Sequence, residues 1–206
     1  MVGLSNPDVG EVAYHGRIFR ELNETQRQGI RKEIGMLFQG GALFDSMSVE
    51  DNVAFPLRMF TDFNKSEVRD RVNFCLMKVK LEGKNNMFPS ELSGGMKKRA
   101  ALARAISINP KYLFCDEPNS GLDPKTSLVI DDLILELTSE FDMTTLVITH
   151  DMNSVMQIGQ KIMFLYKGKN WWTGSNKEIL TTQNKELLDF VYASEFLKQL
   201  KPGQAT

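Results

Sequence analysis

Two adjacent acids, Asp116 and Glu117, follow a short apolar run, "YLFC" at residues 112–115. Such a run is typical of a buried parallel strand, and parallel sheets place their ligands at the carboxyl ends of their strands. At that edge the first acid could hold Mg²⁺, while the second orients and deprotonates an attacking water. A strand-end acidic pair also occurs for structural reasons, so it needs supporting residues before it indicates chemistry.

A Ser-Gly-Gly turn at residues 93–95 opens a helical pattern that runs to Asn109 and stops at Pro110. Backbone amides at the start of a helix attract anions, and glycines let a phosphate approach those amides closely. The turn therefore predicts an anion-binding helix start, and the next question is whose phosphate it holds.

Three further polar residues lie where strands end or helices begin. Gln39 ends "IGMLFQ", His150 follows "TTLVIT", and Asp123 closes the turn "NSGLD" before Pro124. An amide could reach a metal or a water, and an imidazole could hydrogen-bond a terminal phosphate. Each residue also has an ordinary structural interpretation: a solvated strand end for Gln39, a structural histidine for His150 and a helix cap for Asp123.

Short apolar runs alternate with amphipathic patterns along the chain, which predicts an α/β fold. Strands are expected at 11–19 (a pair around His15-Gly16), 34–39, 112–115 and 144–149, with a hairpin over 161–174 that turns at 167–169. The runs 112–115 and 144–149 are continuous, as in parallel strands covered on both faces. Helices are expected around 68–79, from Ser93 to Asn109, from Pro124 to about Glu140, after a Ser175–Glu178 capping box, and over the last 20 or so residues, which carry Leu187, Leu188, Val191 and Leu197.

A largely helical stretch interrupts the series of strands and predicts an inserted subdomain. Four segments are expected. They are 1–40, the rest of an N-terminal core that ends at Gln39; 41–108, the helical subdomain with the Ser-Gly-Gly turn; 109–180, the core with the acidic pair and His150; and 181–206, a helical tail.

Charge and composition exclude several classes of protein. The net charge of −1 argues against a dedicated binder of nucleic acid or of anionic membranes. No run approaches the roughly 18 apolar residues of a membrane span, and the first ten residues show no basic-then-apolar leader. Cys75 and Cys115 lie in apolar segments without metal or redox spacing, so reduced, buried thiols of a cytosolic protein are expected.

Taken in order, these motifs resemble those of the ATP-binding cassette (ABC) ATPases. Gln39 matches the Q-loop, "LSGGM" (92–96) the signature, "DE" (116–117) Walker B, "SGLD" (120–123) the D-loop, and His150 the switch histidine. The resemblance extends from Gly3 to about residue 180. The segments 36–57 and 89–106 are similar to the ATPase subunit of Mla-type phospholipid transport systems, which also carries Met after Ser-Gly-Gly.

The resemblance implies an ABC-type P-loop NTPase core, a parallel sheet with flanking helices, plus an inserted helical subdomain. It implies ATP and Mg²⁺ as ligands, with Asp116 holding Mg²⁺ and Gln39 sensing it. Glu117 would act as general base, and His150 would contact the γ-phosphate. Coupling of ATP hydrolysis to phospholipid transport across the bacterial envelope is the implied activity.

The resemblance also implies partners. Two copies would pair head to tail, so that Ser93, Gly94 and Gly95 of one copy bind the γ-phosphate held by the other, with Asp123 communicating across the dimer. A membrane permease would dock beside the helical subdomain and hold the protein at the inner face of the cytoplasmic membrane. No nucleic acid and no direct contact with lipid are expected.

The family also needs a GxxxxGK[ST] phosphate loop, and no such string occurs in the 206 residues. "GSNKEIL" (174–180) has the wrong spacing, and "GLSNPDVGEV" (3–12) resembles the family segment that follows the helix after that loop. The expectation is a truncated chain that lacks the N-terminal β part and the phosphate-loop strand. Because a sheet without that strand has unpaired edges and open apolar faces, residues 1–206 alone should aggregate and bind ATP negligibly.

Two alternatives stay open at this point. One is a non-transport ABC ATPase of the DNA-repair or translation type, although those proteins carry long coiled-coil insertions or tandem cassettes that this sequence lacks. The other is a catalytically dead fragment or interaction subunit that binds a permease or an intact ATPase without hydrolysing ATP. Glu117 and His150 argue against a dead subunit, because such a protein need not retain them.

Overall fold

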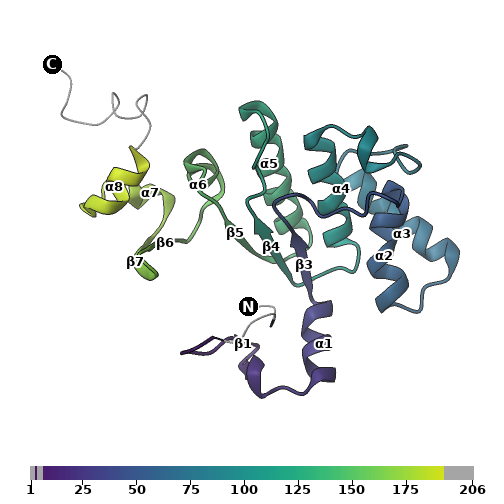
Figure 1. The fold of residues 1–206 in the computed structure, drawn as a ribbon, viewed down its shortest axis with the longest axis horizontal. Coiled ribbons are helices and arrows are strands. Elements are labelled where there is room, and N and C mark those ends of the chain that lie inside the picture. The colour runs from purple at the N-terminus through teal and green to yellow at the C-terminus, as the bar shows by residue number, and fades with distance from the viewer. Residues whose placement is uncertain (1–2, 4–6, 193–206) are drawn as a thin grey trace. The chain divides into compact units, whose positions relative to one another are not determined.

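The structure is a computed structural model that describes residue 3 and residues 7–192. The chain divides into two compact units, one ending at Ile148 and the other beginning at Thr149 (Figure 1). The predicted tail helix is described as α8 (Lys185–Val191), whereas Leu197 lies outside the described residues.

The first unit is built on a parallel sheet of three strands in the order β3-β4-β5. The strands are β3 (Ile34–Leu37), β4 (Tyr112–Asp116) and β5 (Thr144–Ile148), and their register pairs Leu37 with Cys115 and Cys115 with Val147. The predicted strands and the α/β class are therefore confirmed. β3 ends two residues before Gln39, because the chain turns at once, with the Gly41 amide donating to the Phe38 carbonyl.

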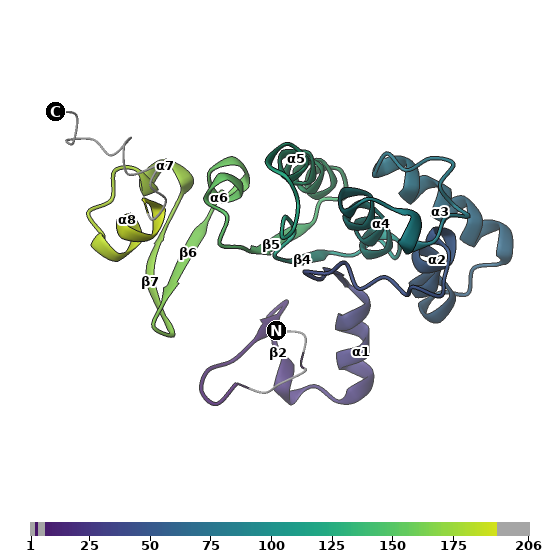
Figure 2. The same ribbon diagram turned by 45° about the horizontal axis from the view of Figure 1, so that its top comes forward.

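Two helices, α4 (Gly94–Ile106) and α5 (Pro124–Glu140), cover one face of this sheet (Figure 2). Both were predicted, and α4 ends three residues early. Arg71 donates from its guanidinium to the carbonyls of Ile106 and Ser107 and so caps that end. Gly35 lets β3 approach α4, since a Cβ there would lie 2.5 Å from the Ala105 carbonyl oxygen.

The other face is covered by the N-terminal segment, a two-stranded hairpin followed by helices. It comprises β1 (Ala13–Tyr14), β2 (Arg17–Ile18), the 3₁₀ turn η1 (Phe19–Glu21) and α1 (Glu24–Lys32). The hairpin turns at His15 and Gly16, both with positive φ, as predicted. The buried core between this segment and the sheet consists of Tyr14, Phe19, Ile30 and Ile34. Sequence analysis missed α1, although the capping box of Asn23 and Gln26 marks its start.

This covering stops short of β5. Leu146 and Ile148 are 38% and 58% exposed, so the prediction that 144–149 is covered on both faces is wrong for the described residues. The physical reason is position: β5 is the edge strand, and the N-terminal cluster packs on the side chains of β3 and β4, such as Met36 and Phe114.

Between β3 and β4 the chain forms the helices α2 (Val49–Phe60) and α3 (Lys65–Lys78), the 3₁₀ turn η2 (Pro89–Glu91), and α4. The predicted helix around 68–79 is confirmed by α3, whose Val68, Val72, Cys75 and Leu76 are buried. Asn52 is fully buried and closes the loop before α2, because its amide bonds the backbone of Phe44, Met47 and Ser48.

Both cysteines are free and buried, as predicted. Burial raises the pKa of Cys75 to about 11 and that of Cys115 to about 12. Both thiols therefore stay protonated in the folded protein near neutral pH.

The second unit contains α6 (Met152–Ile158), a β-hairpin, α7 (Asn176–Ile179) and α8. The hairpin pairs β6 (Ile162–Tyr166) with β7 (Lys169–Gly174) and turns at 167–168, as predicted. The Ser175–Glu178 capping box is also present. Ile179, Leu187 and Val191 form the buried core of this unit. Within the part of the chain that is described, no helix has both the length and the apolar character needed to cross a bilayer.

Candidate functional site

The acidic pair lies at the carboxyl end of β4. Asp116 is the last residue of the strand and is exposed, and Glu117 follows it, half-buried. Glu117 has φ +46°, a left-handed backbone that costs a non-glycine residue about 1–2 kcal/mol. Strained backbone of this kind clusters at functional sites. Backbone hydrogen bonds hold it on both sides: the Glu117 amide donates to the Ile148 carbonyl at 2.9 Å, and the Glu117 carbonyl accepts from the Ser120 amide at 3.1 Å.

Gln39 reaches the turn that follows the acidic pair. Its Nε2 donates to Ser120 Oγ at 3.2 Å, which joins the end of β3 to the turn at 119–123. The turn is anchored to α5, because buried Asn119 donates through Nδ2 to Oδ1 of buried Asp131 on that helix at 2.9 Å. The structure therefore brings Gln39, the acidic pair and this turn to one edge of the sheet.

The Ser-Gly-Gly turn begins α4, as the sequence predicted. Ser93 caps the helix and accepts through Oγ from the Met96 amide at 3.3 Å. Gly94 is exposed and Gly95 is buried. A Cβ on Gly95 would lie 2.6 Å from Thr126 Cγ2, and one on Gly94 would lie 3.2 Å from Leu122 Cδ2. The glycines thus have two effects. They leave the backbone amides at the start of α4 without covering side chains, and they allow close packing against the start of α5.

Asp123 is the cap of α5 and lies beside this contact. Its Oδ1 accepts from the Thr126 amide at 3.0 Å, and its other carboxylate oxygen accepts from the Thr126 hydroxyl. These hydrogen bonds lower the pKa of Asp123, the hydroxyl bond most. The ordinary role of a helix cap is present, and the predicted role of Asp123 across a dimer stays a prediction.

Lys98 is the residue of this edge that sequence analysis missed. It lies on α4, is 5% exposed, and donates from Nζ to the carbonyl of Gln39 and, at 3.2 Å, to the carbonyl of Glu117. Burial lowers the pKa of Lys98, while the nearby Cys115, Glu117 and Asp116 raise it. The sequence did carry a signal, since Lys98 shares the helical face of buried Ala101, Leu102 and Ala105.

His150 belongs to the second unit, where it precedes α6 and the Asp151 cap of that helix. It comes two residues after Ile148, the residue that accepts from the Glu117 amide. Its predicted contact with a terminal phosphate beside Glu117 stays a prediction.

The donor atoms at the sheet edge suit Mg²⁺. The Asp116 carboxylate and the amide oxygen of Gln39 are hard oxygen donors, the type that Mg²⁺ takes. Over residues 7–192, no group of three or more His, Cys, Asp or Glu side chains could hold a metal. A site with one or two protein ligands, completed by waters and substrate phosphates, is the usual form for Mg²⁺.

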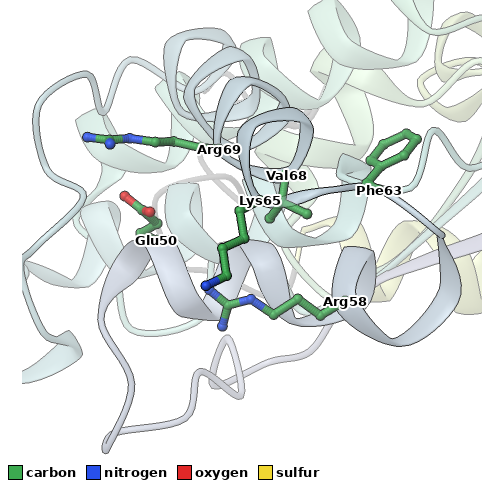
Figure 3. Close-up of a pocket in the computed structure, with 6 residues that line it drawn as sticks. All are labelled: Glu50, Arg58, Phe63, Lys65, Val68 and Arg69. Carbon is green, nitrogen blue, oxygen red and sulfur yellow. The ribbon is translucent and has the colours of Figure 1, made fainter.

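A separate surface pocket of about 510 Å³ lies on the helical segment (Figure 3). It contains none of the predicted nucleotide residues. Three cationic side chains, one acid and two apolar side chains line it: Arg58, Lys65, Arg69, Glu50, Phe63 and Val68. Arg58 is also paired with Asp51 at 2.9 Å.

The comparisons with known proteins agree with the motifs. The family model described as "ABC transporter" matches residues 1–120. The "Probable ribonucleotide transport ATP-binding protein mkl" of Mycobacterium leprae is 38% identical over 191 residues, 93% of this chain and 55% of that protein. The "Intermembrane phospholipid transport system ATP-binding protein MlaF" of Haemophilus influenzae is 38% identical over 189 residues, 92% of this chain and 72% of that protein.

A solved structure is similar as well. The dimeric post-hydrolysis state of the ATP-binding cassette MJ0796 bound to ADP and Pi has a TM-score of 0.74 and 32% identity. The match covers 84% of this chain and 76% of the cassette. The sheet and its flanking helices thus define an ABC-type nucleoside triphosphatase core.

The chain belongs to the ABC transporter family, as its ATPase domain, and its resemblance to the Mla-type ATPases is supported by MlaF. It spans about half the length of the mycobacterial relatives that it matches.

Proposed function

We propose that this chain is the nucleotide-binding part of an ABC transporter that couples ATP hydrolysis to transport. The observation that carries the proposal is the meeting of Gln39, the Asp116–Glu117 pair and the turn at 119–123 at the carboxyl edge of one parallel sheet. A parallel α/β sheet binds its ligands at this edge.

Each predicted site residue has a role in this proposal. Asp116 and Gln39 would hold Mg²⁺, which neutralises charge on the phosphates when bound. Glu117 would orient the attacking water and take its proton, and His150 would contact the γ-phosphate. The fixed backbone of Glu117 supports its role, because general-base catalysis needs a carboxylate held within hydrogen-bonding distance of the water.

The signature turn would act on the nucleotide of a second copy, in a head-to-tail homodimer. Ser93 and Gly94 are exposed at the start of α4, so their amides can meet a phosphate from outside the chain. The similar cassette described as dimeric gives this assembly further support.

A membrane permease is the proposed partner, and it would place the chain at the inner face of the cytoplasmic membrane. The pocket between α2 and α3 supports docking at the helical subdomain, since Lys65 and Arg69 suit an acidic segment and Phe63 an apolar anchor. Phospholipid is the proposed cargo because of the MlaF likeness, although the mycobacterial relative is named for ribonucleotide transport.

Replacing Glu117 by Gln tests the proposal. In the full gene product assembled with its permease, ATP turnover should fall by about 10²- to 10⁴-fold while ATP binding is retained, because only the proton acceptor is lost. Glu136→Gln, at an exposed position of α5, is the matched control and should leave turnover unchanged. Normal turnover in the Glu117→Gln protein would reject the assigned role.

Two measurements distinguish the proposed ATPase from the alternative, an interaction subunit that does not hydrolyse ATP. If the chain copurifies with a permease but shows no turnover even as the full gene product, the alternative is favoured. On residues 1–206 alone, which contain no GxxxxGK[ST] string, millimolar Mg-ATP should leave the melting temperature unchanged, since only bound ligand stabilises a fold. A rise of several degrees would contradict the predicted lack of ATP affinity.

A further inference from the structure

Lys98 joins three segments that are far apart in the sequence. It is carried by α4, and its ammonium donates to the backbone carbonyl of Gln39 and to that of Glu117. The first carbonyl lies just beyond β3, and the second lies just beyond β4. One buried side chain therefore connects the signature helix to both strand ends at the candidate nucleotide site.

The environment of Lys98 indicates more than a packing role. A buried ammonium is unfavourable unless its donors are satisfied, and an apolar residue would suit this face of α4 without that cost. The face is otherwise apolar, with Ala101, Leu102 and Ala105 buried. The partners of Lys98 are carbonyl oxygens, whose positions follow the backbone directly, so the lysine holds main chain rather than a neighbouring side chain.

At or close to both carbonyls, the backbone adopts left-handed conformations, which are unfavourable for non-glycine residues unless other interactions stabilise them. Glu117 has φ +46°, and its carbonyl accepts from the Ser120 amide as well as from Lys98. Past Gln39, Gly41 and Ala42 also have positive φ. A second cation of α4, Arg104, donates to the carbonyls of Gly41 and Ala42 at 2.8 and 2.7 Å.

We propose that Lys98 is a positioning residue that fixes the Gln39 and Glu117 main chain relative to the signature helix, so that the predicted metal-sensing amide and the predicted base keep their places. The inference rests on the proposed function for its effect on turnover. Its effect on the backbone is independent of that function.

A consequence is that the start of α4 and the acidic edge move together. Ser93 and Gly94 begin the same helix that carries Lys98. A phosphate bound at that start would therefore act on a helix already bonded to the main chain of Gln39 and Glu117.

The test compares Lys98→Met with Lys98→Arg in the full gene product with its permease. The methionine keeps the length of the side chain and removes the donors, whereas the arginine keeps charge and donors. Lys84→Met, which removes an exposed lysine from the helical segment, is the matched control. Lys98→Met should lower kcat about 10- to 100-fold with the KM for ATP changed less than about threefold, and Lys98→Arg should recover most of the loss.

Hydrogen exchange supplies a readout that needs no activity. The Gly41 amide donates to the Phe38 carbonyl and the Ser120 amide to the Glu117 carbonyl, so both report on the segments that Lys98 holds. In the nucleotide-free protein, Lys98→Met should speed exchange at these two amides and leave β4 and the rest of α4 unchanged.

The outcomes separate the two proposals. Unchanged exchange at Gly41 and Ser120 in Lys98→Met would overturn the inference, as would faster exchange spread evenly through α4 and β4, which would show a packing role only. Where Lys98→Met fails to fold, Lys98→Gln takes its place, because its amide is too short to reach both carbonyls. A third outcome would be normal turnover in Glu117→Gln together with faster exchange in Lys98→Met confined to the Gly41 and Ser120 amides. That result would reject the proposed function and support the inference.

Discussion

The two faces of the β3-β4-β5 sheet differ sharply in how they are covered. On the face toward α4 and α5, Leu37 and Leu113 are fully buried and Cys115 is 1% exposed. On the opposite face, the N-terminal cluster buries Ile34, but Phe114 is half-buried, and Leu146 and Ile148 are exposed. The strands themselves are apolar on both faces, so the difference arises from what packs against them.

The contrast shows where stability and where function are determined. The buried face joins α4 and α5 to the sheet, and these helices carry Lys98 and the anchor Asp131. The opposite face is open at β5 and so contributes less buried area, and the hydrophobic stabilisation of a side chain follows the area removed from water. The candidate site therefore depends on the buried face.

The largest expected effect comes from truncating matched leucines on the two faces. Leu113→Ala should lower the free energy of unfolding by about 2–5 kcal/mol, because it leaves a cavity under α4 and α5. Leu146→Ala should lower the free energy of unfolding by less than about 1 kcal/mol, because the leucine side chain is already partly solvated. Urea unfolding followed by circular dichroism measures both, and equal losses would show that the open face is covered in solution.

A glycine pair gives the next effect. Gly35→Ala should destabilise the protein by about 1–3 kcal/mol or more, because the new Cβ would meet the Ala105 carbonyl, which belongs to the backbone and cannot move aside. Gly29→Ala in α1 is the control, since nothing lies within 4 Å of a Cβ there. That control should stabilise the protein by about 0.4–1 kcal/mol. A destabilised control, or a neutral Gly35→Ala, contradicts this assignment.

The smallest effect concerns the signature turn. Gly95→Ala should cost about 1 kcal/mol, because overpacking against the Thr126 methyl exceeds the gain in helix propensity. Thr126→Ser removes the methyl and keeps the hydroxyl that bonds Asp123. In that background Gly95→Ala should become neutral or stabilising by thermal denaturation. An unchanged cost would place the clash elsewhere.

The sequence predicted what depends on local pattern. The strands at 34–39, 112–115 and 144–149 and the helix from Pro124 follow from apolar runs, caps and prolines, and the structure contains each of them. The order of the motifs also indicated the family.

What the sequence did not reveal depends on contacts between distant segments. The burial of Lys98 requires Gln39 and Glu117 to converge, and the open face of β5 depends on how far the N-terminal cluster extends. The left-handed backbone of Glu117 is equally invisible, because glutamate gives no signal for positive φ. Pattern alone carries no information about these distances.

The pairing of β3 with β4 has a consequence for how the chain folds. Ile34 pairs with Tyr112, and α2, α3 and α4 all lie between them in the sequence. Closing so long a loop costs conformational entropy before the strands gain any hydrogen bond, and such non-local pairing slows folding. The helices, whose backbone hydrogen bonds are local, can form before the strands pair. Arg71 donates from α3 to the carbonyls at the end of α4, so it ties together two of the helices that separate the paired strands in the sequence.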